Sequence, residues 1–176
     1  MPKDNLPIIA FESQFRWEEW LAENHAQPTG IWLRIFKKSS GVVSLTYAEA
    51  LAEALCYGWI DGQANKYDER SWLQKFTPRR KRSVWSKVNT QHAERLIKAG
   101  KMKPAGLKEI EAAKQDGRWQ QAYDSPKNMT VSEDFLRELE KDSKAKSFFE
   151  TLNKTNLYSI AFRLQTAKKP KQGRGE

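Results

Sequence analysis

The sequence has very few of the residues that cross-link a chain or bind metal ions. Cys56 is its only cysteine, and its two histidines are His25 and His92. A single thiol excludes an internal disulfide, which suits a reducing cytosolic compartment. Structural zinc needs about four clustered Cys or His ligands, and these three residues are widely spaced. We therefore predict no metal site, and no motif of the sequence points to a cofactor.

Long apolar runs and glycine-rich phosphate loops are also missing. The mean hydropathy is −0.81, and no stretch approaches the roughly 20 apolar residues that cross a bilayer. The start of the chain, Met1–Asn5, is not followed by an apolar signal core. These features predict a cytoplasmic protein that is not an integral membrane protein. Without a GxxxxGK loop or a GxGxxG turn, nucleotide-hydrolysing and dinucleotide-dependent enzymes are disfavoured.

The sequence does have enough apolar residues for one packed core. Hydrophobic residues make up 39% of the 176 residues and include seven Trp and eight Phe, and a chain of this length suits one domain. Aromatic and β-branched runs predict strands, and capping residues before an apolar periodicity predict helices. The first half is expected to hold strands at Leu6–Phe11, Ile31–Phe36, Trp59–Gln63 and Ser71–Thr77, with helices over 13–24 and from the capping box Thr46–Glu49 to Gly58.

The second half is expected to contain only helices. Ser83 is a candidate cap for a helix that ends at Ala99, and Pro104 begins the next helix. Thr130–Glu133 reads as a second capping box. Two further helices follow, the last of them from Thr155.

These elements predict an α+β fold in which a small N-terminal antiparallel sheet with helices is followed by an all-helical C-terminal half. Both halves are expected to pack as one domain over residues 1–167, with the sheet-containing part at about 1–78 and the helical part at about 83–167. Residues 168–176 are rich in Lys, Gly and Gln and lack apolar anchors, so a disordered basic tail is expected there.

The positive charge of the chain is concentrated in one segment. The chain carries 31 Lys and Arg against 22 Asp and Glu, a formal net charge of +9. Between Lys75 and Gly106 there are ten Lys or Arg and one acid, Glu94, so this segment alone holds an excess of nine positive charges. A concentrated positive field attracts anionic ligands or surfaces.

Within this segment the basic run Arg79–Arg82 is a candidate anion clamp. Guanidinium groups bind phosphate or carboxylate through two parallel hydrogen bonds, and the free amides of a helix beginning at Ser83 would favour the same charge. We predict a non-enzymatic protein that binds an anionic small molecule, or an acidic protein or lipid surface, at a basic and aromatic site. The expected ligand-binding residues are Trp59, Asp61, Arg79, Arg80, Arg82, Ser83, Trp85 and Asn89.

Other interpretations of these residues remain open. The basic run is equally consistent with a solvated loop, and the oligomeric state is not indicated. Cations between tryptophans could instead bind nucleic acid, although tryptophans on apolar faces are more often core residues. Asp61, before Gly62, is a weak candidate for the acid or base of an enzyme acting on a small acidic or phosphorylated substrate, although Asp-Gly is commonly a turn. Cys56 with His25 or His92 could form a nucleophilic pair, but a small buried thiol is more common.

Six segments, spread in order over most of the chain, share one recognisable pattern. They are Leu45–Leu51, Ala54–Gly62, Phe76–Arg80, Ser83–Asn89, Met102 with Ala105–Leu107, and Asp116–Trp119 with Ala122–Tyr123. In this succession the chain resembles the bacterial YdeI/OmpD-associated family. The resemblance implies a bacteriocin-protection or envelope-stress protein, in a family associated with an outer-membrane porin and with resistance to cationic peptides. It implies no catalytic residues.

Overall fold

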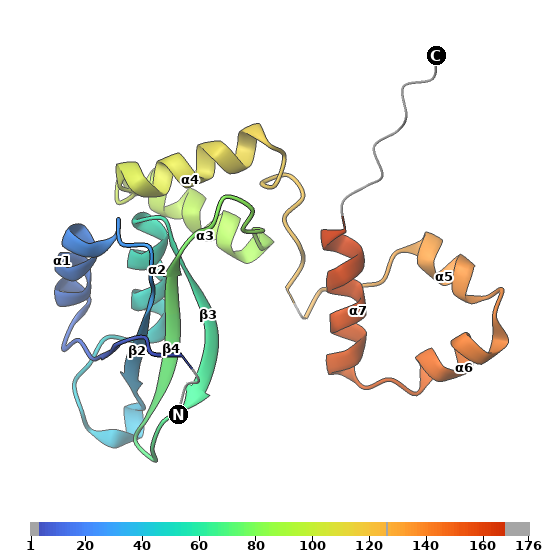
Figure 1. Cartoon of the computed structure of the whole chain (residues 1–176), viewed down its shortest axis with the longest axis horizontal. Coiled ribbons are helices and arrows are strands. Elements are labelled where there is room, and N and C mark those ends of the chain that lie inside the picture. Colours follow the sequence, from blue (N-terminus) through green and yellow to red (C-terminus); the bar gives the residue numbers. More distant parts are fainter. Residues whose placement is uncertain (1–3, 126, 168–176) are drawn as a thin grey trace. The chain divides into compact units, whose positions relative to one another are not determined.

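A computed structural model describes residues 4–125 and 127–167 of the chain (Figure 1). Contacts within the chain group it into two compact units, and each unit is described by itself. Unit 1 comprises Met1–Ser83 and Gln91–Asp116, and unit 2 comprises Val84–Thr90 and Gly117–Glu176. The single domain over 1–167 stays a prediction, and the tail predicted at 168–176 lies outside the described residues.

Among the described residues, unit 1 is built on a four-stranded sheet with the order β1-β2-β4-β3. The strands are β1 (Ile8–Ile9), β2 (Ile31–Phe36), β3 (Trp59–Lys66) and β4 (Ser71–Pro78). β2, β4 and β3 pair antiparallel, as predicted, whereas the short β1 pairs with β2 in parallel. Parallel strands need a crossover connection, and helix α1 (Gln14–Asn24) provides it. The predicted α+β class is confirmed.

Helix α2 (Tyr47–Cys56) begins at the capping box that the sequence predicts. Thr46 Oγ1 accepts a hydrogen bond from Glu49 N at 3.3 Å, and the Glu49 carboxylate accepts one from Thr46 N at 2.7 Å. The helix ends before Gly58, whose φ of +76° lies in the left-handed region that favours glycine. α1 and α2 pack against each other beside the sheet (Figure 1).

Aromatic side chains form the core of unit 1. Trp17, Trp59 and Phe76 are fully buried, and the ring centroid of Trp17 lies 6.4 Å from that of Trp59 and 5.7 Å from that of Phe76. Trp17 Nε1 donates to Ala50 O at 3.0 Å, and Trp59 Nε1 donates to His25 O at 2.9 Å. Because both indole N–H groups have backbone acceptors, burying these rings leaves no donor unsatisfied.

Helix α3 (Lys87–Lys98) is capped by Ser86, so the predicted cap at Ser83 is wrong. The Ser86 hydroxyl accepts a hydrogen bond from the backbone N–H of Asn89, in the first turn, at 3.1 Å. Tyr123 N donates to Trp85 O at 3.0 Å, and Ser86 forms a β-bridge with Tyr123. These bonds hold Trp85 and Ser86 in an extended conformation, so α3 can begin only after them, at Lys87.

Helix α4 (Pro104–Gln115) begins at Pro104, as predicted, and its first turn lies against the end of α2. A Cβ atom on Gly106 would lie 2.4 Å from Cys56 O and 2.7 Å from Leu55 O. Lys103 N also donates to Cys56 O at 3.2 Å. The missing side chain at Gly106 therefore allows direct backbone contact between the two helices.

In the described part of unit 2, three further helices follow: α5 (Glu133–Leu139), α6 (Ser143–Glu150) and α7 (Lys154–Thr166). The predicted capping box at Thr130–Glu133 is wrong, because Ser132 is the N-cap residue and Thr130 stands too early to reach the first turn. α7 begins one residue before the predicted Thr155, because Asn153 is its N-cap. The Asn153 side chain accepts a hydrogen bond from the backbone N–H of Asn156 at 3.0 Å. Over residues 4–125 and 127–167, none of the helices is long and apolar enough to cross a membrane.

Candidate functional site

A basic pocket of unit 1 opens where β4 ends, and Arg79 is the first residue after that strand. Its volume is about 540 Å³. The ends of α1, α2 and β4 and the first turn of α4 supply its walls. The lining residues are His25, Ala26, Tyr57, Gly58, Pro78, Arg79, Pro104, Ala105, Lys108 and Glu109. One member of the predicted clamp, Arg79, therefore lies in a pocket.

Arg79 adds a permanent positive charge to the lining of this pocket. The residue is 8% exposed, and its backbone N–H donates to Gly58 O at 3.0 Å, which continues the pairing of β3 with β4. A guanidinium group stays protonated and presents a planar array of five donors. Lys108 adds a second positive charge and Glu109 one negative charge. Together these three side chains leave the lining with a single net positive charge.

The first turn of α4 forms part of the wall of the same pocket. Lys103 is the N-cap residue of α4, and no side chain caps this end. Pro104 has no N–H, but the N–H groups of Ala105 and Gly106 have no acceptor within the helix, so this end favours anions. Gly58 allows the close approach, because a Cβ atom there would lie 3.0 Å from Ala105 O and 3.2 Å from Glu109 Cγ.

His25 supplies an imidazole whose orientation is fixed by the end of α1. Its Nδ1 lies 3.0 Å from Leu21 O. A carbonyl can only accept, so Nδ1 is the donor in this contact. The indole of Trp59 donates to His25 O at 2.9 Å. Trp59, a predicted ligand-binding residue, is buried and supports this wall of the pocket from the core.

The rest of the predicted clamp lies on a turn at the surface of unit 1. Ser83 N donates to Arg80 O at 2.8 Å, and Arg80 N donates to Ser83 Oγ at 2.9 Å. Arg80 and Arg82 are both exposed. Ser83 therefore closes a turn that presents two guanidinium groups to solvent, and it adds no helix terminus to the site.

Two predicted site residues, Trp85 and Asn89, belong to unit 2. Trp85 is 2% exposed, and its ring centroid lies 4.8 Å from that of Trp119. Asn89 N donates to Ser86 Oγ in the cap of α3. Because a buried indole offers no face to a nucleic-acid base, neither Trp59 nor Trp85 supports stacking. Binding of nucleic acid at the exposed cations stays a prediction.

Asp61 lies on β3, beside an irregularity of the β3–β4 pairing between Asp61 and Ala64. The Tyr47 hydroxyl donates to Asp61 Oδ2 at 2.7 Å. Burial raises the pKa of Tyr47 well above its usual value, and the hydrogen bond to Asp61 and its charge add to this effect. Tyr47 therefore stays a donor that orients the Asp61 carboxylate. A catalytic role for Asp61 stays a prediction.

The thiol of Cys56 is buried, and its reactivity can be predicted. Cys56 is 1% exposed, and burial, followed by the charge of Glu53, raises the pKa of its thiol to about 12. Since the thiolate is the reactive form, iodoacetamide should alkylate the native protein more than about 100-fold more slowly than the urea-unfolded chain at about pH 8.5. Mass spectrometry over time measures both rates. Equal rates would show that Cys56 is an accessible nucleophile.

Two family models match separate parts of the chain. Residues 9–109 match a domain of unknown function, DUF8412. This match covers more than half of the chain, so the protein belongs to the DUF8412 family. Residues 128–172 match the family described as Bacteriocin-protection, YdeI or OmpD-Associated, and the predicted resemblance is confirmed for this partial region. No curated protein and no solved structure matches the sequence.

The basic pocket lies entirely within the DUF8412 match, since its lining residues run from His25 to Glu109. Sequence reasoning missed His25, Lys108 and Glu109, because the ends of distant elements bring them together. Two features of the sequence could have indicated where the pocket lies: Gly58, at the end of one predicted helix, and Pro104, at the start of the next. In the described ranges of the chain, no group of three or more His, Cys, Asp or Glu side chains could hold a metal ion.

Proposed function

We propose that this protein acts by binding a small anion, a carboxylate or a phosphate, in the basic pocket of unit 1, and that it catalyses no reaction. Arg79 carries the proposal, because its guanidinium belongs to a residue only 8% exposed that lines a pocket of about 540 Å³. A charge on a largely buried residue is screened less by water, so it attracts an anion more strongly than the same charge on the surface. Lys108 and the first turn of α4 favour the same ligand charge.

For its role in the cell we propose bacterial stress response and bacteriocin protection in the cytoplasm. Support for the protective role comes from residues 128–172, whose matching family is described by bacteriocin protection. Support for the compartment comes from the single cysteine. In this proposal the DUF8412 part senses or sequesters the anion.

The binding proposal is tested by calorimetric titration with inorganic phosphate and with citrate at low ionic strength. Saturable binding to the wild-type protein is expected. Arg79→Met removes the charge and the donors but keeps an unbranched side chain, and it should weaken binding about tenfold or more, as losing a charged hydrogen-bond partner does. Lys108→Met should weaken binding by a smaller factor, because its flexible ammonium is a surface charge.

Arg82→Met is the matched control, because it removes the same charge from an exposed position on the adjacent turn. It should change the affinity less than about twofold. Far-UV circular dichroism of each variant checks that the fold is retained. Equal weakening by Arg79→Met and Arg82→Met, or saturable binding that survives Arg79→Met, would contradict the proposed pocket.

The exposed turn Arg80–Ser83 supports a second candidate function, binding of nucleic acid through its phosphates. Arg80 and Arg82 face solvent, and such contacts release counterions, so affinity for a short duplex should fall steeply with salt. The double variant Arg80→Ala with Arg82→Ala would then abolish binding while Arg79→Met would not. This pattern separates the two candidates, since the pocket predicts the opposite order.

A further inference from the structure

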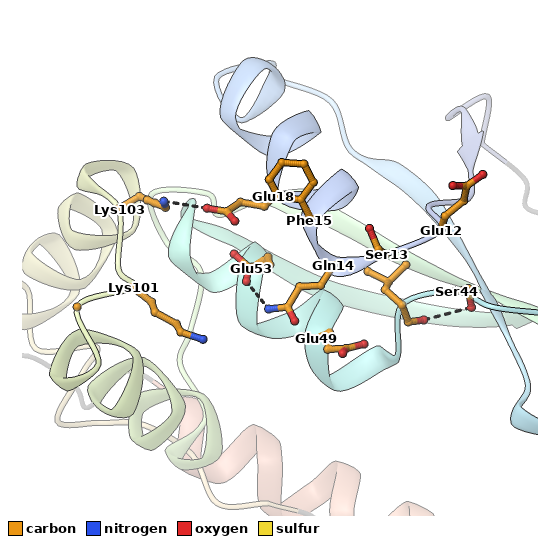
Figure 2. A pocket seen from close by; sticks show the side chains of 12 residues that line it. Glu12, Ser13, Gln14, Phe15, Glu18, Ser44, Glu49, Glu53, Lys101 and Lys103 are labelled. Atoms are coloured by element: carbon orange, nitrogen blue, oxygen red, sulfur yellow. Dashed lines mark hydrogen bonds and ion pairs between the residues drawn. The ribbon is translucent and has the colours of Figure 1, made fainter.

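A pocket of unit 1 beside the start of α1 and one face of α2 has polar side chains that bond to one another (Figure 2). Lys103 Nζ pairs with Glu18 at 2.9 Å, and Gln14 Nε2 donates to Glu53 Oε1 at 2.5 Å. A polar ligand would have to displace these bonds, and the displacement would cost much of what its own bonds contribute. This pocket therefore carries no proposal.

A pocket of unit 2 has the opposite character. Its volume is about 690 Å³, and its walls come from α5, α6, α7 and the segment before α5. Of the ten lining residues two are lysines, none is an acid, and all the others except Thr130 are apolar or aromatic. Small-molecule sites commonly enclose about 300–1,000 Å³ between mostly apolar walls with a few polar groups.

α7 contributes one helix face to this pocket. The lining residues Lys154, Leu157, Tyr158 and Ala161 recur at the spacing of a single face. Along the helix axis, Lys154 and Ala161 are about 10 Å apart. This wall therefore begins with a positive charge at the N-terminal end of α7 and continues as apolar surface.

The segment before α5 is held along the C-terminal part of α7. Gln165 Nε2 donates to Thr130 O at 3.4 Å, and Val131 follows as a lining residue. α5 adds Leu136 and α6 adds Phe149. Four separate segments thus bound the space, a shape that suits a small molecule better than a helix of a partner protein.

The apolar walls of this pocket still have surface to bury. α5 and α6 are only seven and eight residues long, and neither contains a buried residue. Leu136 is 39% exposed. Removing such apolar surface from water is favourable, so an apolar group that enters the pocket gains binding energy and stabilises helices that are marginal by themselves.

The lysines of the lining favour a negative charge. Over residues 4–125 and 127–167, neither Lys127 nor Lys154 forms an ion pair. Lys154 is the first residue of α7, where the helix dipole adds positive partial charge. An anionic group is therefore favoured at this end of the pocket, and a cationic group is repelled.

We propose that this pocket binds a single-chain alkyl carboxylate, with the carboxylate at Lys154 and the alkyl chain along Leu157 and Ala161. Such a ligand matches a mostly apolar space that has a cation at one end. A neutral hydrocarbon would leave the lysine without a partner, and a sugar phosphate would place hydroxyl groups against apolar walls that cannot bond them. All the lining residues except Lys127 lie within the match over 128–172, so the inference concerns a part of the chain outside the proposed anion pocket.

The test is a calorimetric titration of the whole protein with decanoate, below the concentration at which decanoate forms micelles. Saturable binding is expected. Along the series hexanoate, octanoate and decanoate, each added pair of methylene groups should strengthen binding about fivefold or more, because each enters the apolar part of the pocket. Decylammonium has the same chain and the opposite charge, and it should bind about tenfold more weakly than decanoate.

Four variants test the two walls separately. Lys154→Gln should weaken decanoate binding about threefold or more, whereas Lys144→Gln, at an exposed lysine of α6 outside the lining, should change it less than about twofold. Leu136→Gln should weaken binding about threefold or more. Its control is Phe148→Gln, since Phe148 is 67% exposed and does not line the pocket. Thermal unfolding of each variant separates lost binding from lost folding.

Several results would overturn the proposal. They are absence of saturable binding, an affinity independent of chain length, equal affinity for decanoate and decylammonium, and equal weakening by a variant and its control. The site is also distinct from the proposed anion pocket, so Arg79→Met should leave the affinity for decanoate unchanged and Lys154→Gln should leave that for phosphate unchanged. Loss of decanoate binding in Arg79→Met, with the fold retained, would place the ligand in unit 1 and overturn the assignment.

Discussion

Trp17→Ala is expected to lower the free energy of unfolding by about 4 kcal/mol, within the usual cost of removing a buried aromatic side chain. Trp17 is fully buried in unit 1. Its ring stacks on Trp20 with centroids 5.4 Å apart and lies 5.7 Å from Phe76. Its Nε1 donates to Ala50 O at 3.0 Å. The substitution thus removes packing between α1, α2 and β4 and leaves a buried carbonyl without its donor.

Two variants divide this effect into its parts. Trp17→Phe keeps most of the ring but removes the donor to Ala50 O, and it should cost about 1–3 kcal/mol. Phe15→Ala, on the same helix but at a residue 61% exposed, should change stability by less than about 0.5 kcal/mol. Urea unfolding followed by far-UV circular dichroism measures all three. A Trp17→Ala protein as stable as Phe15→Ala would show that the aromatic cluster does not hold unit 1 together.

Features that depend on residues close together in the sequence were predicted correctly. Thr46 and Glu49 cap α2 because both partners of the box lie within one turn. Gly58 ends the same helix because its left-handed φ is a local property of the backbone. Pro104 begins α4 for a similar reason, since it needs no amide at a first helical position.

Features that depend on a distant part of the chain were not predictable in this way. Ser83 and Ser86 are equally good caps on composition, and a bridge between Ser86 and Tyr123 decides between them. The parallel pairing of β1 with β2 is a second example, because it depends on where α1 places the start of β2 relative to β1. No short window of sequence contains either fact.

In three dimensions, part of the positive charge of the basic segment between Lys75 and Gly106 is neutralised by ion pairs. Three of its lysines pair with acids from other parts of the chain. Lys75 pairs with Asp4, Lys87 with Asp124 at 2.8 Å and Lys103 with Glu18 at 2.9 Å. Sequence reasoning located the cations correctly, but it could not tell which of them meet an acid. Arg79 differs from its basic neighbours Arg80 and Arg82 through burial, which the sequence does not show.

Gly106→Ala is expected to destabilise the protein by about 2–3 kcal/mol, as overpacking of a tight contact does. In an ordinary helix interior the same change stabilises by about 1 kcal/mol, because alanine is the better helix former. The sign reverses here because the new Cβ atom would lie 2.4 Å from Cys56 O and 2.5 Å from Met102 Sδ. Backbone at the end of α2 cannot yield without moving α4.

That movement should also reach the basic pocket, because Pro104 and Ala105 line it from the first turn of α4. Gly106→Ala should therefore weaken phosphate binding together with stability. Gly62→Ala is the matched control, since its Cβ atom would meet Lys75 Cβ at an ordinary 3.7 Å, and stability should change by less than about 0.5 kcal/mol. If Gly106→Ala instead raised the urea midpoint, α2 and α4 would not be in backbone contact, and the pocket that depends on this contact would lose one wall.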